Sequence, residues 1–524
     1  MQITIDHIRV EVTEGMTIMQ AAASHGISIP ALCYREGHAN HPSCMICLVK
    51  DLGRDRLLTS CSFPVEEGMN ILTHSHEIHE ARKEALELLL SDHAGDCEAP
   101  CRRSCPAFMD IPNMNRLIAA GRWDEALSLV REEIALPLIL SYICTAPCEK
   151  ACHRASIDGA VSICLLKRET ARDSSRRNSG LLLPVDRSGK KIAIVGTGPA
   201  GLSAAFYLLR LGHECTLFDR HDMPGGMLRY HIPEDKLPQA ILEAEIDCIR
   251  QMGASFALNT AVTRELFDDI LLREFNAIIL ATGGEEKMMA EEFGLELDEH
   301  GIKVSRTTYE TLHPGIFACG NMIRKRQMAV RSVAQGKAAA LSADHFLRTG
   351  KPKGVKHKFN SAFGRLRESE FGEYLKESFA HERIEPAKGF DGGYSAEEAM
   401  LEAKRCLNCD CRKPVSCKLR IYASEYQAHQ KHYAGPDRKQ ITRSMHHDQV
   451  VYEPEKCIKC GLCVEITQKE KEHLGLTFIG RGFDVRVGVP FGETVRDALM
   501  KTGEAVVEAC PTGALALKKG YERS

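Results

Sequence analysis

Cysteines are the residues whose number and spacing point most directly to chemistry. The chain holds 22 cysteines among 524 residues, and most stand in groups a few residues apart. Thiolates at such spacing can converge on one metal ion or iron–sulfur cluster. In a cytosolic protein, as we expect this one to be, thiols stay reduced. Binding of a metal or cluster is therefore favoured over disulfide bonds. Cys215, Cys248 and Cys319 stand alone, and we expect them to be small buried hydrophobic residues.

Composition narrows the class of protein. The net charge is −3, so the basic excess typical of nucleic-acid-binding proteins is absent. The N-terminus lacks the basic and apolar regions of a signal peptide, and no apolar run approaches the ~18 residues that span a bilayer. We therefore expect a cytoplasmic location, no membrane span and no nucleic-acid partner.

The elements that must position the cysteines can be placed from periodicity. Alternation of apolar and polar residues predicts a hairpin over 2–12, and helical spacing predicts a short helix over 17–24 and an amphipathic helix over 77–91. Residues 107–170 are predicted to be helical and 171–179 to be a polar linker. Residues 190–349 show the strand, glycine turn and helix pattern of an α/β unit.

The first cysteine group indicates a [2Fe–2S] centre. Cys33, Cys44, Cys47 and Cys61 follow the predicted hairpin and helix, and four thiolates on loops of a small β-rich domain suit such a centre better than zinc. Residues 1–75 resemble the N-terminal domain of the large iron–sulfur subunit of respiratory NADH dehydrogenase and of iron-only hydrogenases.

The next group has the spacing Cys97-Glu-Ala-Pro-Cys101-Arg-Arg-Ser-Cys105, followed by Cys144-Thr-Ala-Pro-Cys148-Glu-Lys-Ala-Cys152. It resembles the helical domain shared by the small subunit of bacterial glutamate synthase and dihydropyrimidine dehydrogenase, which holds two [4Fe–4S] clusters with interleaved ligands. The resemblance implies that Cys97, Cys101 and Cys152 serve one cluster, while Cys105, Cys144 and Cys148 serve the other.

Two ligands of that family are missing. Its fourth ligand to the second cluster is Glu or Gln, where this chain has Lys167, whose cation cannot ligate iron. Cys164, one helical turn earlier on the same face, is the candidate replacement. The first cluster lacks a cysteine near Ala94. His93 is the candidate there, because imidazole replaces thiolate in some iron–sulfur centres, although a lone His is more often a surface or capping residue.

A dinucleotide site is indicated by Gly196-Thr-Gly198-Pro-Ala-Gly201 between a predicted strand and helix, with Asp219 ending the next strand. Pro224–Pro233, Ala281–Gly284 and Gly315–Asn321 resemble FAD-contacting segments of the glutamate synthase small subunit, with Asn321 where the family has Asp. The predicted cofactor-binding residues are Gly196, Gly198, Pro199, Ala200, Gly201, Asp219, Arg220, Gly225, Gly226, Met227, Leu228, Arg229, Ile232, Pro233, Ala281, Thr282, Gly283, Gly320, Asn321 and Ala334.

The family's second nucleotide domain, for NADPH, is missing. Only a short segment separates Gly284 from Gly294, where the return segment begins, and the sequence has no second Gly-x-Gly-x-x-Gly. The flavin is therefore not expected to take hydride from a nicotinamide bound to this same chain.

Two further cysteine groups lie near the C-terminus. Cys457, Cys460, Cys463 and Cys510 have the spacing of one ferredoxin-like [4Fe–4S] cluster, and this segment again resembles NADH dehydrogenase and hydrogenase iron–sulfur subunits. Cys406, Cys409, Cys411 and Cys417 predict either a further [4Fe–4S] cluster or Zn²⁺.

The predicted fold is multidomain α/β and α+β. It comprises a β-grasp [2Fe–2S] domain (1–75), an α-helical domain with two [4Fe–4S] clusters (76–180), a Rossmann-like FAD domain without the NADPH insertion (181–350), a linker with a four-cysteine metal site (351–430) and a ferredoxin-like [4Fe–4S] domain (431–524).

The leading hypothesis is an electron-transfer subunit of a soluble multi-subunit oxidoreductase, with one [2Fe–2S], three or four [4Fe–4S] and one FAD. From the resemblances, its partners would be an FMN subunit that oxidises NAD(P)H and a terminal hydrogenase or formate dehydrogenase. Electron bifurcation at the FAD stays open, and no catalytic side chain is assigned. The alternatives are a self-sufficient FAD reductase and a cluster scaffold with a vestigial flavin site.

Overall fold

The computed structural model describes residues 1–172, 186–284, 286–355, 358–379 and 381–518. These residues form two compact units. The first unit comprises residues 1–99, 357–377 and 408–524, and the second comprises 100–356 and 378–407. Most of the polar linker expected over 171–179 lies outside the described residues.

The N-terminal part of the first unit is a mixed five-stranded sheet. Its order is β2-β1-β5-β3-β4, with β1 antiparallel to β2 and parallel to β5. Ile3, Ile5 and Val10 alternate into a core that also buries Ile18 and Ala22 of the first helix. This arrangement confirms the predicted hairpin, helix and β-grasp fold. The elements are β1 (Gln2–Ile5), β2 (Ile8–Glu11), α1 (Ile18–Ser24), β3 (Leu48–Asp51), β4 (Arg56–Thr59) and β5 (Asn70–Leu72).

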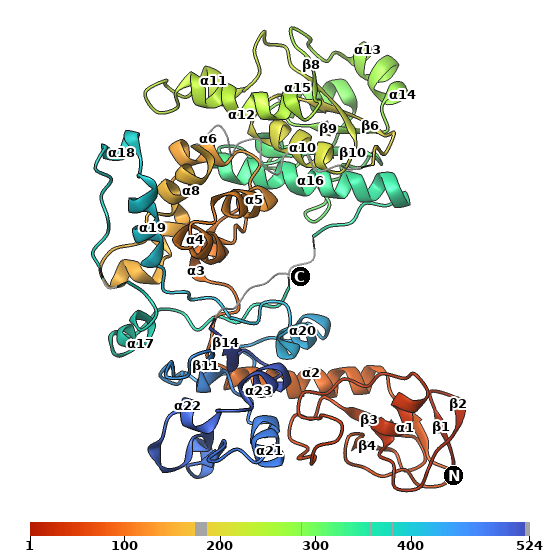
Figure 1. Cartoon of the computed structure of the whole chain (residues 1–524). Coiled ribbons are helices and arrows are strands. Elements are labelled where there is room, and N and C mark those ends of the chain that lie inside the picture. The colour runs from red at the N-terminus through yellow and green to blue at the C-terminus, as the bar shows by residue number, and fades with distance from the viewer. Residues whose placement is uncertain (173–185, 285, 356–357, 380, 519–524) are drawn as a thin grey trace. The chain divides into compact units, whose positions relative to one another are not determined.

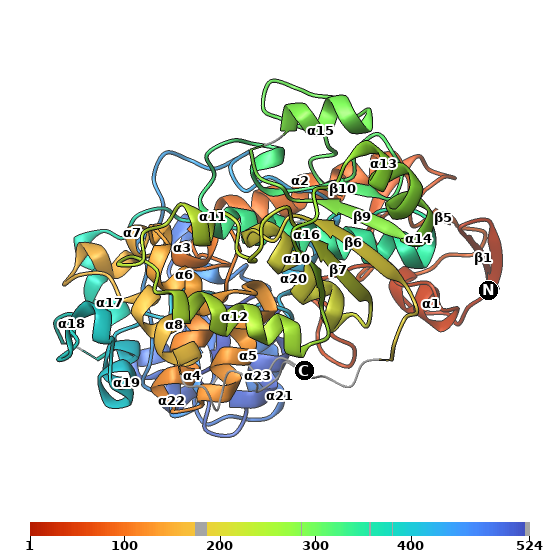
Figure 2. The same cartoon turned by 90° about the horizontal axis from the view of Figure 1, so that it is seen from above.

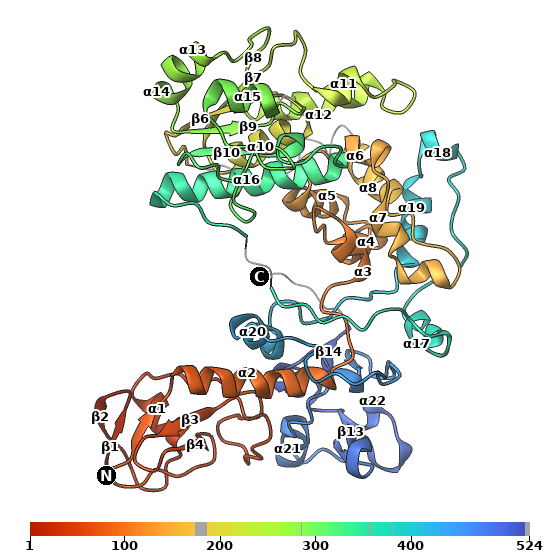
Figure 3. The ribbon, with the colours of Figure 1, turned by 180° about the vertical axis from the view of Figure 1, so that it is seen from behind.

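The rest of the first unit is built from short elements and one long helix, α2, which Figure 3 shows beside β3 and β4. Ser75 caps α2 by accepting from the Ile78 amide. Two small antiparallel sheets pair β11 with β14 and β12 with β13. The elements are α2 (His76–Ser91), η4 (Glu368–Glu370), α17 (Phe371–Leu375), α20 (Lys418–Glu425), β11 (Val450–Tyr452), η5 (Pro454–Lys456), α21 (Leu462–Lys469), β12 (Thr477–Ile479), η6 (Gly482–Asp484), β13 (Arg486–Gly488), η7 (Pro490–Gly492), α22 (Val495–Ala498), α23 (Gly503–Ala509) and β14 (Leu515–Leu517).

The second unit begins with short helices, as the sequence predicts for residues 107–170. Asp110 caps α4, and proline opens α6 and α7, where the missing amide costs nothing. The elements are α3 (Pro100–Ser104), α4 (Ile111–Ala119), α5 (Trp123–Glu133), α6 (Pro137–Ile143), α7 (Pro147–Lys150), η1 (His153–Ser156), α8 (Ile163–Arg172), and, from later in the chain, α18 (Gly389–Gly392) and α19 (Ala396–Lys404).

A parallel five-stranded sheet of order β10-β9-β6-β7-β8 forms the rest of the second unit, as Figure 2 shows from above. Helix α16 runs alongside α10 (Figure 1), and a Cβ at Gly336 would lie 2.2 Å from the Ala200 carbonyl oxygen. The elements are β6 (Lys191–Val195), α10 (Pro199–Arg210), β7 (Glu214–Phe218), α11 (Met227–Tyr230), α12 (Gln239–Gln251), β8 (Ser255–Ala257), α13 (Arg264–Leu266), η2 (Phe267–Leu271), α14 (Leu272–Glu274), β9 (Ala277–Leu280), α15 (Glu286–Phe293), β10 (Ile316–Ala318), η3 (Gly320–Met322) and α16 (Ala329–Thr349).

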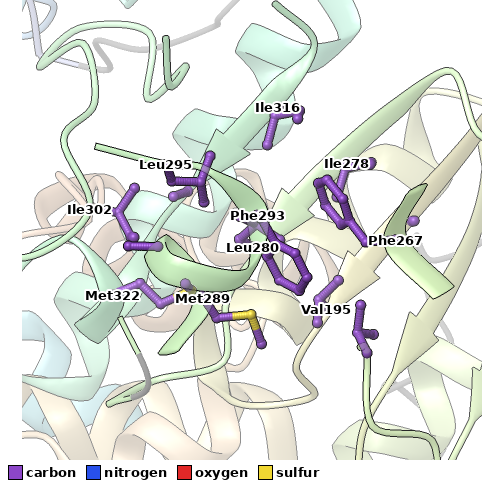
Figure 4. Close-up of a cluster of buried hydrophobic side chains, with 14 of the residues drawn as sticks. Val195, Phe267, Ile278, Leu280, Met289, Phe293, Leu295, Ile302, Ile316 and Met322 are labelled. Carbon is purple, nitrogen blue, oxygen red and sulfur yellow. The ribbon is translucent and has the colours of Figure 1, made fainter. Parts of the chain in front are cut away.

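Helix α15 occupies the place in the chain where a second nucleotide domain would be inserted. Figure 4 shows Met289 and Phe293 of α15 packed among Val195, Leu280 and Phe267. These side chains are buried in one hydrophobic cluster. The short segment after Gly284 therefore closes over the sheet as part of its core.

The linker with its own four-cysteine site, expected over 351–430, is not a separate part of the structure. Residues 378–407 join the second unit, and 408–430 join the first. Buried ion pairs explain the attachment of 378–407, because fully buried Arg405 pairs with Glu402 and with Asp158. Separating such a pair is energetically costly, because it would leave a buried charge without a partner.

Candidate iron–sulfur centres and nucleotide site

The four cysteines of the N-terminal domain converge. The sulfurs of Cys33 and Cys44 lie 3.4 Å apart, and all four cysteines are buried. Hydrogen bonds from Cys44 and Cys61 lower the pKa of the Cys33 thiol, and one from Cys61 lowers that of Cys47. Two facing pairs of thiols match the two irons of a [2Fe–2S] centre, each held by two thiolates.

Cys105, Cys144, Cys148 and Cys164 meet within the second unit. Side-chain hydrogen bonds join Cys164 to Cys144 and to Cys148, and the bond from Cys164 raises the pKa of Cys144. The Glu149 carboxylate accepts from the Cys164 amide at 2.9 Å, which anchors α7 to the start of α8. The structure thus places Cys164 where the sequence analysis needed a fourth ligand.

Lys167 is buried against this group of cysteines. Burial favours the neutral amine, but Cys164, Cys144, Cys148 and Cys105 together raise the pKa of Lys167 overall. The ammonium therefore stays charged beside the thiols. Lys167 offsets the negative charge that the thiolates of a bound cluster would bring.

Cys152 and Cys406 also lie together in the second unit. The Arg154 guanidinium donates to the carbonyl of Arg405, the residue before Cys406, and Arg405 donates to the Gly159 carbonyl at 2.9 Å. Burial raises the pKa of Cys152, and the nearby Cys406 raises it further. Cys101 belongs to α3, which packs against α7. The sequence analysis missed the link between Cys406 and Cys152 because spacing says nothing about distant segments.

The expected group of Cys406, Cys409, Cys411 and Cys417 is divided. Cys406 belongs to the second unit, whereas Cys411 and Cys417 belong to the first, together with Cys97 and His93. Over the described ranges, no three His, Cys, Asp or Glu side chains have the arrangement that holds a single metal ion. The structure therefore lends no support to one four-cysteine Zn²⁺ site at 406–417.

The C-terminal cysteines line one small cavity. Cys457, Cys460, Cys463 and Cys510 surround it with Tyr452 and Leu515. Burial, followed by the charge of Cys510, raises the pKa of Cys457 to about 12. The Lys459 amide donates to the Cys457 sulfur at 3.3 Å, a bond that stabilises a thiolate. The predicted set thus comes together around an enclosed apolar space.

A cavity of about 480 Å³ follows the glycine motif of the sheet. Gly196 and Gly201 are needed for close packing, because added Cβ atoms would lie 2.4 Å from the Ala281 oxygen and 1.9 Å from the Gly196 oxygen. A Cβ at Gly198 would meet no atom within 4 Å. Open space therefore lies over the N-terminus of α10, where backbone amides bind pyrophosphate.

The Asp219 carboxylate at the end of β7 is held in place. It accepts from the Thr197 amide at 2.9 Å and from the His221 amide at 3.0 Å. Burial alone would raise its pKa, but these hydrogen bonds lower it overall. The ionised carboxylate at the cavity wall can accept a hydrogen bond from a ribose hydroxyl.

Most predicted cofactor-binding residues line this cavity. They are Gly196, Gly198, Pro199, Ala200, Asp219, Arg220, Gly226, Met227, Leu228, Ile232, Ala281, Thr282, Gly283, Gly320 and Asn321. Gly201, Gly225, Arg229, Pro233 and Ala334 are not among the lining residues. Arg229 instead pairs with Glu243. The lining residues that sequence reasoning missed include Ile143, His221, Thr263, Met288 and Gln327, which follow no recognisable motif.

Ile143 connects the cavity with the cysteines. It ends α6 and lines the cavity, and the next residue is Cys144. The cavity also reaches Met288 and Glu292 of α15. The wall of the nucleotide cavity thus includes the residue that precedes Cys144 and part of helix α15.

Three protein families match successive parts of the chain. Residues 1–76 match the 2Fe-2S iron-sulfur cluster binding domain, and 72–179 match dihydropyrimidine dehydrogenase domain II, 4Fe-4S cluster. Residues 194–255 match the NAD(P)-binding Rossmann-like domain. The chain thus contains two iron–sulfur domains followed by a Rossmann-like nucleotide-binding domain. These matches confirm the predicted fold classes of the first three domains.

The curated relatives share parts of the chain. The subunit beta of NADP(+)-dependent formate dehydrogenase from Moorella thermoacetica is 37% identical over 207 residues, covering 35% of this chain and 29% of the relative. The glutamate synthase [NADPH] small chain of Bacillus subtilis is 40% identical over 185 residues (35% and 37%). The PreT subunit of NAD-dependent dihydropyrimidine dehydrogenase from Escherichia coli is 31% identical over 239 residues (45% and 56%).

The chain therefore spans 29% to 56% of the length of these relatives. A solved NAD+-reducing [NiFe]-hydrogenase aligns over 100% of this chain and 90% of its own, at 12% identity and a TM-score of 0.37, which is too weak a likeness to support an argument.

No helix among the described residues is long and apolar enough to cross a membrane.

Proposed function

We propose that the chain is an FAD-containing electron-transfer subunit of a multi-subunit oxidoreductase. It would relay electrons between an NAD(P)H-oxidising FMN subunit and a terminal enzyme such as a hydrogenase or formate dehydrogenase. The observation that carries this proposal is the nucleotide cavity whose wall includes Ile143, next to Cys144. A flavin in this cavity would exchange electrons with the cluster that has Cys144, the residue after Ile143, as one of its ligands.

The cavity residues suit FAD. The open space at Gly198 would take the pyrophosphate, Asp219 the ribose, and Asn321 beside α11 the ribityl chain. When bound, the flavin supplies the conversion between two-electron and one-electron transfer. The protein's part is to orient the ring, exclude water from it and set its potential by nearby hydrogen-bond donors and charges.

The cysteine neighbourhoods support four ligand sets. Cys33, Cys44, Cys47 and Cys61 would hold [2Fe–2S], and Cys457, Cys460, Cys463 and Cys510 would hold [4Fe–4S]. Cys105, Cys144, Cys148 and Cys164 would hold the cluster next to the flavin. Cys101, Cys152 and Cys406 would supply three thiolates to a further cluster.

Helix α15 supports the dependence on partner subunits. Its Met289, Ala290 and Phe293 belong to the buried core of the sheet, so the segment after Gly284 has no freedom to bind a nicotinamide as a separate domain. Electrons would then enter and leave through clusters. This distinguishes the proposal from a self-sufficient reductase, in which NAD(P)H reduces the FAD directly.

Anaerobic titration of the purified full chain tests the function. We expect one FAD per chain, bleaching by dithionite, and no bleaching by NADH or NADPH unless an NAD(P)H-oxidising partner subunit is added. Direct bleaching by NADH or NADPH would contradict the proposal in favour of a self-sufficient reductase. Protein that binds no FAD when supplied with it would instead favour a cluster scaffold.

A further inference from the structure

Cys97 has neighbours in the first unit that its sequence position does not suggest. The Cys411 amide donates to the Cys97 carbonyl at 3.2 Å. The Cys97 sulfur lies 3.2 Å from the Ser361 hydroxyl and accepts from the Ser361 amide at 3.4 Å. Three segments remote in sequence therefore meet at Cys97, whose thiol is buried.

The loop that carries Cys411 and Cys417 is fixed tightly at this point. Lys413 donates to the Cys510 carbonyl at 2.8 Å, and the Leu419 amide donates to the Pro511 carbonyl at 3.2 Å. A Cβ at Gly513 would lie 2.3 Å from the Cys411 sulfur, so only glycine leaves room for it. The backbone thus holds Cys411 in one place.

The three thiols are buried and share cationic neighbours. Cys97, Cys411 and Cys417 are 7%, 7% and 5% exposed. The Cys417 thiol lies near enough to Cys411 and Cys97 to interact electrostatically with both. Buried Arg420 interacts with Cys97 and Cys411, and buried Lys456 interacts with Cys411. Both cations are already paired with carboxylates, Arg420 with Glu98 at 2.6 Å and Lys456 with Glu453 at 2.5 Å. Thiolates here would therefore need a bound cation for compensation.

His93 is the remaining donor in this region. Its Nδ1 atom is buried without a hydrogen-bond partner. A neutral imidazole with a free nitrogen lone pair is able to ligate iron. The Ala94 amide donates to the Glu455 carbonyl at 2.9 Å. Added Cβ atoms at Gly95 and Gly513 would lie 2.7 and 3.9 Å from the Lys456 side chain, so this side chain runs between the segment of His93 and the glycine next to Cys411.

We propose that Cys97, Cys411, Cys417 and His93 hold an additional [4Fe–4S] cluster in the first unit. Its ligands are drawn from two groups that the sequence spacing assigned to separate sites. The proposal rests on the electron-transfer function above, and it adds a one-electron carrier. Each of the four donors would bind a different iron, so the donors need not lie as close together as the ligands of a single metal ion. This agrees with the absence, among the described residues, of three side chains arranged to hold one metal ion.

The hydrophobic surroundings give this site a role. Cys417 packs in one buried cluster with Cys33 and Cys44 of the [2Fe–2S] group and with Cys460 of the C-terminal group. Leu86, Leu90 and Leu419 belong to the same cluster. The additional centre would join the N-terminal and C-terminal centres through a continuous, water-free core, so that each can exchange single electrons with it.

Reconstitution of the full chain with ferrous iron and sulfide tests the proposal. Cys411→Ser and Cys417→Ser are each expected to lose about four irons and the same component of the low-temperature EPR spectrum, and Cys97→Ser to lose that component too. The matched control Cys215→Ser, at a lone buried cysteine, should lose none. Full iron content in both loop variants, or one zinc per chain at this site, would overturn the proposal.

Two milder variants keep the test decisive if a serine variant misfolds. His93→Ala is expected to keep the cluster but release one iron on mild oxidation, with the EPR signal of a three-iron cluster. An unchanged spectrum would remove His93 from the ligand set. Gly513→Ala, which crowds the Cys411 sulfur, should shift the same EPR component, and an unaltered component would contradict the placement of Cys411.

The same samples separate this proposal from the proposed function. FAD content and bleaching of the flavin by dithionite, which reduces it without the relay, should be unchanged in Cys411→Ser and Cys417→Ser. A wild-type chain with the extra cluster but without FAD would refute the flavoprotein function alone. A chain with FAD that is reduced through its partner, but whose loop variants lose no iron, would refute the additional cluster alone.

Discussion

The cysteine group around Cys164 and the one around Cys97 are assembled in different ways. The first takes all its members from residues 105–164, on a few short helices of one domain. The second joins Cys97 to a loop near residues 411–417. The resemblance to the helical two-cluster domain predicts most of the first group, and helical spacing adds Cys164. Nothing in the local sequence suggests the second group, because contacts between distant segments bring it together.

The largest expected effect tests the local site. Cys164→Ala should remove about four irons, because it leaves the cluster near the flavin with three ligands. Adding Lys167→Glu should restore part of the iron, since the resembling family uses a carboxylate or amide at that position. Both variants are compared with wild type by iron analysis. Full iron content in the single Cys164→Ala variant would show that Cys164 is not a ligand of this cluster.

Two glycines of the Gly196–Gly201 motif should give the next effect. Gly201→Ala should lower the free energy of unfolding by about 1–3 kcal/mol, because its Cβ would meet the Gly196 oxygen at 1.9 Å. Gly198→Ala should leave stability unchanged and reduce FAD binding, since its Cβ meets only open space. Thermal denaturation and flavin content measure the two effects. Equal FAD binding by Gly198→Ala and wild type would argue against pyrophosphate at this point.

A pH effect is expected from Glu245, which accepts from the Leu138 and Ile139 amides at the start of α6. Burial raises its pKa from 4.5 to about 7. The folded state therefore binds the extra proton, and its stability falls as pH rises from about 4.5 to about 7, by at most about 3 kcal/mol. Denaturant unfolding of Glu245→Gln at several pH values should lose this dependence. A pH dependence equal to that of wild type would contradict it.

The smallest effect concerns Lys167. Lys167→Met should keep the four irons but lower the midpoint potential of the neighbouring cluster by about 60–120 mV, one or two tenfold steps of a one-electron equilibrium. The reason is that the buried ammonium stabilises the more negative, reduced cluster. EPR-monitored redox titration measures the shift, with Lys150→Met on α7 as a control. A potential equal to that of wild type would mean that the ammonium does not face the cluster.

The sequence by itself determined most of the domain types. Alternating Ile3, Ile5 and Val10 specify the first sheet, and Gly196, Gly198 and Gly201 specify the turn over α10. Cys164 is predicted as a ligand because it lies one helical turn before Lys167, where the resembling family has its ligand. These features depend on the two-residue period of strands, the 3.6-residue period of helices and the steric need for glycine within one short turn. They can therefore be read without knowing how distant segments meet.

Only the tertiary structure decided which cysteines share a neighbourhood. The sequence predicts one linker with four cysteines over residues 351–430. In the structure, the buried pair of Arg405 and Glu402 holds residues up to 407 in the second unit. Lys413 and Gly513 fix the residues after 407 in the first unit. The pairings of Cys406 with Cys152 and of Cys411 with Cys97 follow from that division. They depend on burial and hydrogen bonding between segments far apart in sequence, for which local spacing carries no signal.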